Sequence, residues 1–180
     1  MPTSPAESQA TGIVNAMSVD VEDYFQVSAF ENTISSNDWD KLPCRVEGNT
    51  ERILELFAEH DVKATFFMLG WVAERYPGLV RRIVDSGHEL ASHGYTHTRV
   101  TRQTPAVFSE DIAKTKSLLE DIAGSEVRGY RAASYSIVSN TLWAHDLLRE
   151  AGYCYSSSIY PIHHDLYGIP GAPRFSYLPG

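Results

Sequence analysis

Short apolar runs alternate with amphipathic helical segments along most of this chain, and this alternation constrains the fold more than any other feature. The apolar runs cover residues 13–21, 63–69, 88–92, 127–131 and 153–157, and each is predicted to be a strand. Apolar residues recur at helical spacing between these runs, in 50–60, 71–86, 104–123 and 141–151. Strands that alternate with helices form parallel sheets, so the sequence predicts a (β/α) barrel or an open doubly wound sheet.

Several residues predict where these elements begin and end. Asn49 or Thr50 is predicted to cap the first helix, which follows a stretch without period at residues 24–48. A connection of that length within one domain is typical of a functional loop or lid. Pro77 lies inside the second helical segment, so this helix is predicted to break in two, and Thr104 is predicted to cap the third.

Composition limits the class of protein. The chain has 180 residues, 43% hydrophobic and 21% charged, which suits one domain with a core at residues 13–180. A net charge of −8 argues against a nucleic-acid partner, and no run approaches the ~18 apolar residues of a membrane span. Residues 1–12 are polar and rich in Pro and Ser, so they are predicted to be a disordered lead-in rather than a signal peptide. Cys44 and Cys154 form no CxxC motif, and we expect reduced cysteines and a cytoplasmic location.

Two histidines four residues apart, His93 and His97, follow the third predicted strand. Imidazoles at this spacing can converge on one divalent metal such as zinc, cobalt, nickel or iron. The alternative is a polar surface loop, because the pair lacks the glutamate of a HExxH helix. An acidic cluster after the first predicted strand, formed by Asp20, Glu22 and Asp23, has the carboxylates that the histidines lack. Together they favour the metal site.

Polar groups also follow the other predicted strands. Arg131 ends the fourth strand, and residues 156–158, all serines, lie at the end of the fifth. The carboxyl ends of parallel strands meet at one edge, where barrels and open α/β sheets build their sites. The sequence therefore predicts one functional site at this edge, with Arg131 as a functional cation, and a surface cation or a structural ion-pair partner as the alternatives.

Four motifs in order resemble those of the polysaccharide deacetylase family, the NodB-homology carbohydrate esterases. They read SVDVED, SHGYTH, GYRAAS and YSSS, and the resemblance spans roughly residues 13–170. The spellings DVEDYF and HDLYGIP are most similar to a branch associated with exosortase (PEP-CTERM) exopolysaccharide clusters. The resemblance implies an α/β fold, a distorted seven-stranded TIM-like (β/α) barrel. Only five strands are predicted, so it also implies that the C-terminal part of the domain at 13–180 is missing.

The resemblance implies a role for each acidic residue. His93 and His97, with one carboxylate, would hold a divalent metal, zinc in the first place. An Asp-x-Asp pattern makes Asp20 the general base and Glu22 the ligand, and strand alternation favours this assignment. The alternative register makes Asp23 the ligand and Glu22 the base.

Two further residues receive roles in the same way. Arg131 would pair with the base, and a backbone N–H near Ser134 would stabilise the oxyanion. The chain departs from the family pattern at Ala133, where Pro is usual, and at Ser156, where Asp is usual. The family's late general-acid histidine has no counterpart, because His163 and His164 come too early and belong to a run expected to form a loop over the barrel mouth.

These residues together predict a metal-dependent hydrolase that removes N-acetyl groups from amino sugars of a polysaccharide or its precursor. Two alternatives stay open at this point. One is a hydrolase of a non-sugar amide, similar to allantoinase, and the other is a non-catalytic barrel that binds glycan. The oligomeric state stays open as well.

Overall fold

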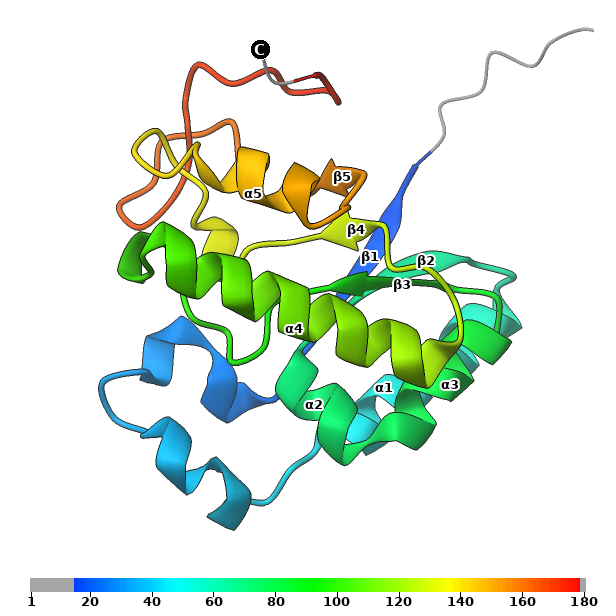
Figure 1. Ribbon diagram of the computed structural model, residues 1–180. Helices are drawn as coiled ribbons and strands as arrows, with labels where there is room; N and C mark the ends of the chain where they lie inside the picture. The colour runs from blue at the N-terminus through cyan, green and yellow to red at the C-terminus, as the bar shows by residue number, and fades with distance from the viewer. Residues whose placement is uncertain (1–14, 179–180) are drawn as a thin grey trace, which may run out of the picture.

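The computed structural model describes residues 15–178, which form one parallel five-stranded sheet covered by helices (Figure 1). The strands are β1 (Met17–Val21), β2 (Ala64–Met68), β3 (Glu89–Ser92), β4 (Gly129–Tyr130) and β5 (Tyr155–Ser156). The helices are α1 (Val46–Glu59), α2 (Gly70–Arg75), α3 (Pro77–Asp85), α4 (Pro105–Ala123) and α5 (Ala144–Glu150). Short 3-10 helices are η1 (Tyr24–Gln26), η2 (Ser28–Phe30), η3 (Ser36–Lys41), η4 (Val100–Arg102) and η5 (Ala133–Tyr135). The predicted lead-in at residues 1–12 lies outside the described residues.

The order of the strands separates the two predicted architectures. Each strand lies beside the strand that precedes it in the chain, in the order β1-β2-β3-β4-β5. The helices also contact one another side by side, α1 with α3, α3 with α4 and α4 with α5. A doubly wound sheet would reverse its strand order and place helices on both faces. The sheet therefore has the arrangement of a (β/α) barrel, of which the described residues form five strands.

Alternation along the strands divides their side chains between two faces. Phe66, Met68, Leu90 and Tyr130 are buried in the core beneath the helices. Phe67 pairs in register with Asp20 and Ala91, so these three residues project to the opposite face. That opposite face is the interior side of the barrel and carries the polar groups described below.

The long connection at residues 24–48 is ordered by its own aromatic core. Phe25 and Trp39 are buried, and their rings contact each other and Trp71 at centroid distances of 5.6–5.9 Å. Phe25 and Trp39 are therefore structural residues of this connection rather than open faces for a sugar ring.

The first helix begins earlier than predicted. α1 starts at Val46, and neither Asn49 nor Thr50 caps it. The Asp23 carboxylate accepts hydrogen bonds from the backbone N–H groups of Arg45 and Val46, at 2.5 and 2.8 Å. A cap supplied from 23 residues away in the chain has no local signal, so the prediction was wrong at this boundary.

Two other boundaries are confirmed, and the start of the last helix differs. α2 ends at Arg75 and α3 begins at Pro77, so the predicted break is present. The Thr104 hydroxyl accepts a hydrogen bond from the Val107 N–H at 3.3 Å and caps α4. α5 begins at Ala144, three residues later than predicted, because the Thr141 hydroxyl instead accepts from the Val138 N–H at 2.8 Å in a turn. None of the described helices is long and apolar enough to cross a membrane.

Candidate metal centre

The register of the sheet brings the predicted site residues to one edge and one face. The parallel ladder continues one residue past four strands, where the N–H groups of Leu69, His93, Arg131 and Ser157 each donate to the preceding strand. Glu22 occupies the same row at the end of β1. Because side chains alternate along a strand, this row and Asp20 project to the interior face. The structure therefore brings the predicted site residues of this row together at the carboxyl edge, as expected, and their function stays a prediction.

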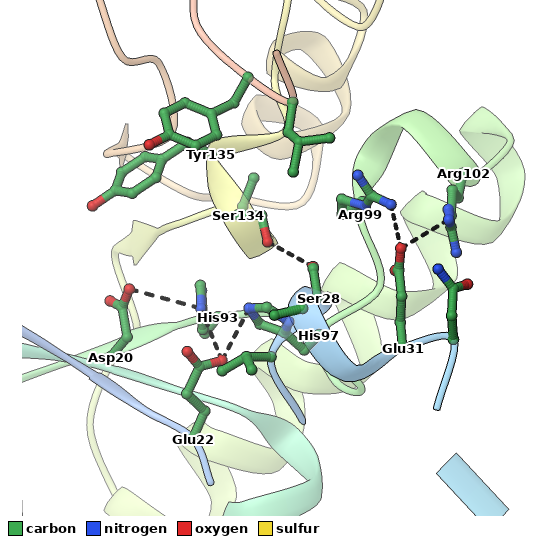
Figure 2. Close-up of a pocket in the computed structure, with 16 residues that line it drawn as sticks. Asp20, Glu22, Ser28, Glu31, His93, His97, Arg99, Arg102, Ser134 and Tyr135 are labelled. Carbon is green, nitrogen blue, oxygen red and sulfur yellow. Dashed lines mark hydrogen bonds and ion pairs between the residues drawn. The ribbon is translucent and has the colours of Figure 1, made fainter. Parts of the chain in front are cut away.

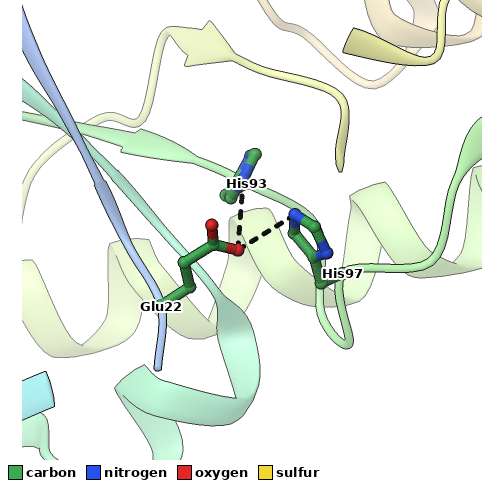
Figure 3. A group of neighbouring side chains, drawn as sticks. All are labelled: Glu22, His93 and His97. Atoms are coloured by element: carbon green, nitrogen blue, oxygen red, sulfur yellow. Dashed lines mark ion pairs between the residues drawn. The ribbon is translucent and has the colours of Figure 1, made fainter. Parts of the chain in front are cut away.

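Glu22 and His93 of this row form a compact cluster with His97 from the loop after β3 (Figure 3). Both imidazole Nε2 atoms point toward Glu22 Oε2, at 3.9 Å from His93 and 2.9 Å from His97. The histidines are almost fully buried, and the Glu22 side chain is 19% exposed. Two imidazole nitrogens and one carboxylate oxygen are a donor set that zinc and other first-row divalent metals accept.

Hydrogen bonding and burial prepare these side chains for a metal. His93 Nδ1 lies 2.8 Å from the Arg131 carbonyl, so this nitrogen carries the proton and donates it, which leaves the Nε2 lone pair free. Burial is the main cause that lowers the pKa of His93, so the imidazole is neutral near pH 7. Burial also acts to raise the pKa of Glu22, but the adjacent His97 and His93 outweigh it and lower that pKa. The cluster therefore fits a resident divalent cation.

Asp20 lies next to the cluster but makes different contacts. Its Oδ1 accepts a hydrogen bond from Arg131 Nη1 at 2.5 Å, and its Oδ2 lies 3.9 Å from His93 Nε2. The Asp20 side chain is 27% exposed, whereas the Arg131 side chain is 9% exposed. This ion pair orients the Asp20 carboxylate beside the three clustered side chains.

Arg131 is itself fixed from three strands. Its Nη2 donates to the hydroxyls of Ser18, at 3.0 Å, and Ser157, at 2.9 Å. The guanidinium lies over the Phe67 ring, 3.9 Å from the centroid. Arg131 is thus an ion-pair partner within the site rather than a surface cation.

Asp23 does not belong to the cluster. It is buried, and its carboxylate accepts from the N–H groups of Tyr24, Arg45 and Val46. Gln26 Oε1 in turn accepts from the Asp23 N–H at 2.8 Å, which completes a capping box at η1. The structure therefore brings Glu22, and not Asp23, to the histidines.

The loop between the two histidines is held by two helices. The N–H groups of Gly70 and Trp71, at the start of α2, donate to the carbonyls of Gly94 and Tyr95 at 2.9 and 3.0 Å. From α4, the Asp111 carboxylate accepts from the Tyr95 N–H at 3.2 Å. Gly94 has φ +76° and His97 has φ +54°, so the loop is tightly turned. This turn brings both imidazoles to the same side.

Ser134 lies at the rim, at a strained position. It has φ +51° and sits in η5 directly after β4, and its hydroxyl lies 2.7 Å from that of Ser28. The left-handed backbone conformation of Ser134 turns the chain sharply at the edge of the site. Strained backbone positions of this kind cluster at active sites and ligand-binding sites. Ser134 therefore lies at the cavity beside the cluster, and the role of a nearby backbone N–H as oxyanion donor stays a prediction.

A cavity of about 600 Å³ opens over these groups (Figure 2). Asp20, Glu22, His93 and His97 line one part of it, and Ser134 and Tyr135 line another. Leu166 and Tyr167 also line it, so the run at 161–170 does pass over the mouth as predicted. His164 stacks on Tyr167 with a centroid distance of 4.0 Å.

Several residues of the site were missed from the sequence. Ser18 and Ser157 hold Arg131, and Asp111 holds the histidine loop. Glu31, Arg99 and Arg102 form one wall of the cavity. Ser18 carried the only usable signal, since it precedes Asp20 by two residues and so shares its face. The contacts of the other missed residues depend on strand register and helix packing, so no short stretch of sequence predicts them.

The sequence matches the polysaccharide deacetylase family over residues 35–155, and the chain belongs to that family. The predicted fold class and family are thereby confirmed. The exosortase-associated branch stays a prediction from the motif spelling.

Named relatives fall within the same class. The chain is 36% identical to a peptidoglycan-N-acetylglucosamine deacetylase of Bacillus cereus over 96 residues, which is 53% of this chain and 35% of that protein. It is 34% identical to a chitooligosaccharide deacetylase of Rhizobium leguminosarum bv. trifolii over 97 residues, 52% of this chain and 45% of that protein. The chain thus spans less than half the length of these relatives.

Solved structures support the same grouping. The Bc1960 peptidoglycan N-acetylglucosamine deacetylase superposes with a TM-score of 0.58 at 27% identity. The similarity covers 78% of this chain and 54% of that one. The shared part is thus about half of that longer chain.

Proposed function

We propose that this protein is a metal-dependent hydrolase that removes acetyl groups from N-acetylated amino sugars of a glycan. The observation that carries the proposal is the cluster of Glu22, His93 and His97 beside the Asp20–Arg131 ion pair, in a cavity of about 600 Å³. The family and the named relatives support the substrate class. The cluster does not discriminate between peptidoglycan and chitooligosaccharide, because both polymers present the same acetamide group.

The three clustered side chains would hold the metal, and zinc suits this donor set, with cobalt, nickel or iron as alternatives. When bound, the metal supplies Lewis acidity and lowers the pKa of water toward ~7. His93 is kept in the ligating tautomer by the Arg131 carbonyl, and His97 is placed by the clamped loop. The chain's own contribution to binding is thus a set of pre-oriented donors.

Asp20 would act as the general base. Its Oδ1 is engaged by Arg131, so Oδ2, on the side of His93, is the atom that would take a proton from water. Water oxygen adds to the acetyl carbonyl carbon, the C–N bond breaks, and the amine nitrogen gains a proton as acetate leaves. Protonated Asp20 would return that proton to the amine. The two histidines that line the cavity, His93 and His97, would not do so because their Nε2 atoms would bind the metal.

A direct test measures amine release from chitohexaose and from peptidoglycan strands, before and after chelation and with zinc or cobalt added back. We expect activity to need the metal and Asp20→Asn to lose about 10²-fold or more of kcat while retaining the metal. Asp146→Asn, on the exposed face of α5, is the matched control.

The same assay separates the alternatives. Allantoin serves as the non-sugar amide, and release of its product without amine release from glycans would replace the proposed substrate class. Glycan binding without turnover by the metal-loaded chain would favour the non-catalytic barrel.

A further inference from the structure

One wall of the cavity carries a positively charged cluster that the proposed chemistry does not use. Glu31 follows η2, Arg99 precedes η4, and Arg102 ends it, so the cluster joins two segments far apart in the chain. In Figure 2 these side chains lie across the cavity from Asp20 and Glu22. The three residues also border a second cavity of about 470 Å³, so they form the boundary between two open spaces.

The charges in this cluster do not balance. Arg99 Nη2 and Arg102 Nη2 both reach the same Glu31 oxygen, Oε1, at 2.5 and 2.8 Å. One carboxylate therefore faces two guanidinium groups, which leaves one positive charge in excess. This excess stands out because the whole chain has a net charge of −8. A partly enclosed positive wall attracts anions more strongly than an exposed lysine or arginine does.

The cluster also has unused hydrogen-bond donors. Arg99 Nε is buried and has no hydrogen-bond partner among residues 15–178. The Arg99 side chain is 13% exposed, whereas that of Arg102 is 53% exposed and can move toward a ligand. If the cluster only joined η2 to η4, one arginine would neutralise Glu31. The second guanidinium, on the exposed Arg102 side chain, indicates a site for a further anion.

We infer that this wall binds a carboxylate-bearing sugar unit of the glycan, next to the N-acetylated unit that occupies the metal cluster. The fork of a guanidinium can match a carboxylate, and each arginine now contacts Glu31 through only one nitrogen. This inference rests on the proposed function for the placement of the glycan. It adds that the preferred polymer is anionic rather than neutral.

The test compares binding of two oligosaccharides of similar length to the zinc-loaded full chain by titration calorimetry. Chitohexaose is neutral, and a hyaluronan hexasaccharide carries uronic carboxylates beside N-acetylglucosamine. We expect the wild type to bind the anionic oligosaccharide about three- to tenfold more tightly, with the preference reduced by added salt.

Variants of opposite charge sign make the test specific. Arg102→Gln should remove most of the preference, while Glu31→Gln, which deletes the competing carboxylate, should increase it. If the cluster were purely structural, both substitutions would change the preference for the anionic oligosaccharide in the same direction. Arg149→Gln, on exposed α5, is the matched control, and thermal unfolding checks that Glu31→Gln remains folded.

The outcomes separate this inference from the proposed function. Equal affinity of the wild type for the two oligosaccharides, or the same shift in both cluster variants, would overturn the inference. A retained anionic preference without amine release from any glycan would remove the proposed function and support the inference.

Discussion

The neighbouring carboxylates Glu22 and Asp23 perform unrelated tasks because they project to different sides of the chain at the end of β1. Glu22 faces the two histidines, and its Oε2 is buried without a conventional hydrogen bond among the described residues. Asp23 is saturated by three backbone N–H groups at the start of η1 and α1. A carboxylate so engaged has little capacity left for a metal.

The first prediction separates these two residues. Asp23→Ala should lower the free energy of unfolding by about 2 kcal/mol, because it removes a cap and leaves buried N–H groups unpaired, and should leave zinc affinity unchanged. Glu22→Gln should instead reduce zinc affinity by more than the about 10–100-fold typical of an outer-shell partner. Urea unfolding and competition with a chromophoric chelator measure the two quantities. Zinc loss in Asp23→Ala with retention in Glu22→Gln would reverse the assignment.

At the scale of elements, the candidate metal ligands depend on helices that lie outside the Glu22, His93 and His97 cluster. α2 holds the carbonyls of Gly94 and Tyr95, and α4 holds the Tyr95 N–H through Asp111. Gly70 leaves the required room, since a Cβ there would lie 2.4 Å from the Tyr95 ring. Helix packing thus sets the distance between the imidazoles.

The second prediction concerns this clamp. Asp111→Ala should weaken zinc binding about tenfold, because the loop loses the acceptor that fixes Tyr95, whereas Asp111→Asn keeps an acceptor and should recover most of the affinity. Glu110→Ala, on the exposed side of the same helix, is the control. The chelator competition again gives the affinity, and equal values for Asp111→Ala and Glu110→Ala would exclude the clamp.

At the scale of the whole molecule, His88 links the sheet to the helical layer away from the site. Its Nδ1 accepts a hydrogen bond from the Ala64 N–H at 3.2 Å, and its ring contacts Phe66 and Phe57. An accepting Nδ1 requires the neutral ring. Burial, with the nearby Lys63 charge, lowers the pKa of His88 below its usual 6.5.

The third prediction is a pH dependence of stability. Because the pKa of His88 is lower in the folded chain, the unfolded chain binds the proton first as the pH falls. The contribution of His88 to the free energy of unfolding is therefore full above about pH 6.5 and decreases below it. His88→Gln keeps an acceptor but does not titrate, and should therefore flatten the decrease between pH 6.5 and 5. Urea unfolding at several pH values, with exposed His60→Gln as control, measures the slope. An unchanged slope in His88→Gln would assign the dependence to other groups.

The sequence by itself determined the elements and the groups that a parallel edge would bring together. Alternation of period 2 placed Asp20 and Glu22 on one face, and spacing linked His93 with His97. These signals are local, since each depends on residues within a few positions of one another. The alternation left a barrel or a doubly wound sheet open, and the resemblance of the four motifs implied the barrel and the family, which the strand order and the match at residues 35–155 confirmed.

Only the tertiary structure decided between neighbouring carboxylates and showed what supports the site. Asp23 caps a helix 22 and 23 residues away, and Arg131 meets Asp20 and Ser18 across 111 and 113 residues. Glu31 meets Arg99 across 68 residues. Such contacts follow from strand register and helix packing, which no short window of the sequence encodes. The ligand pattern was therefore readable from the chain, whereas the assignment of Glu22 over Asp23 required the fold.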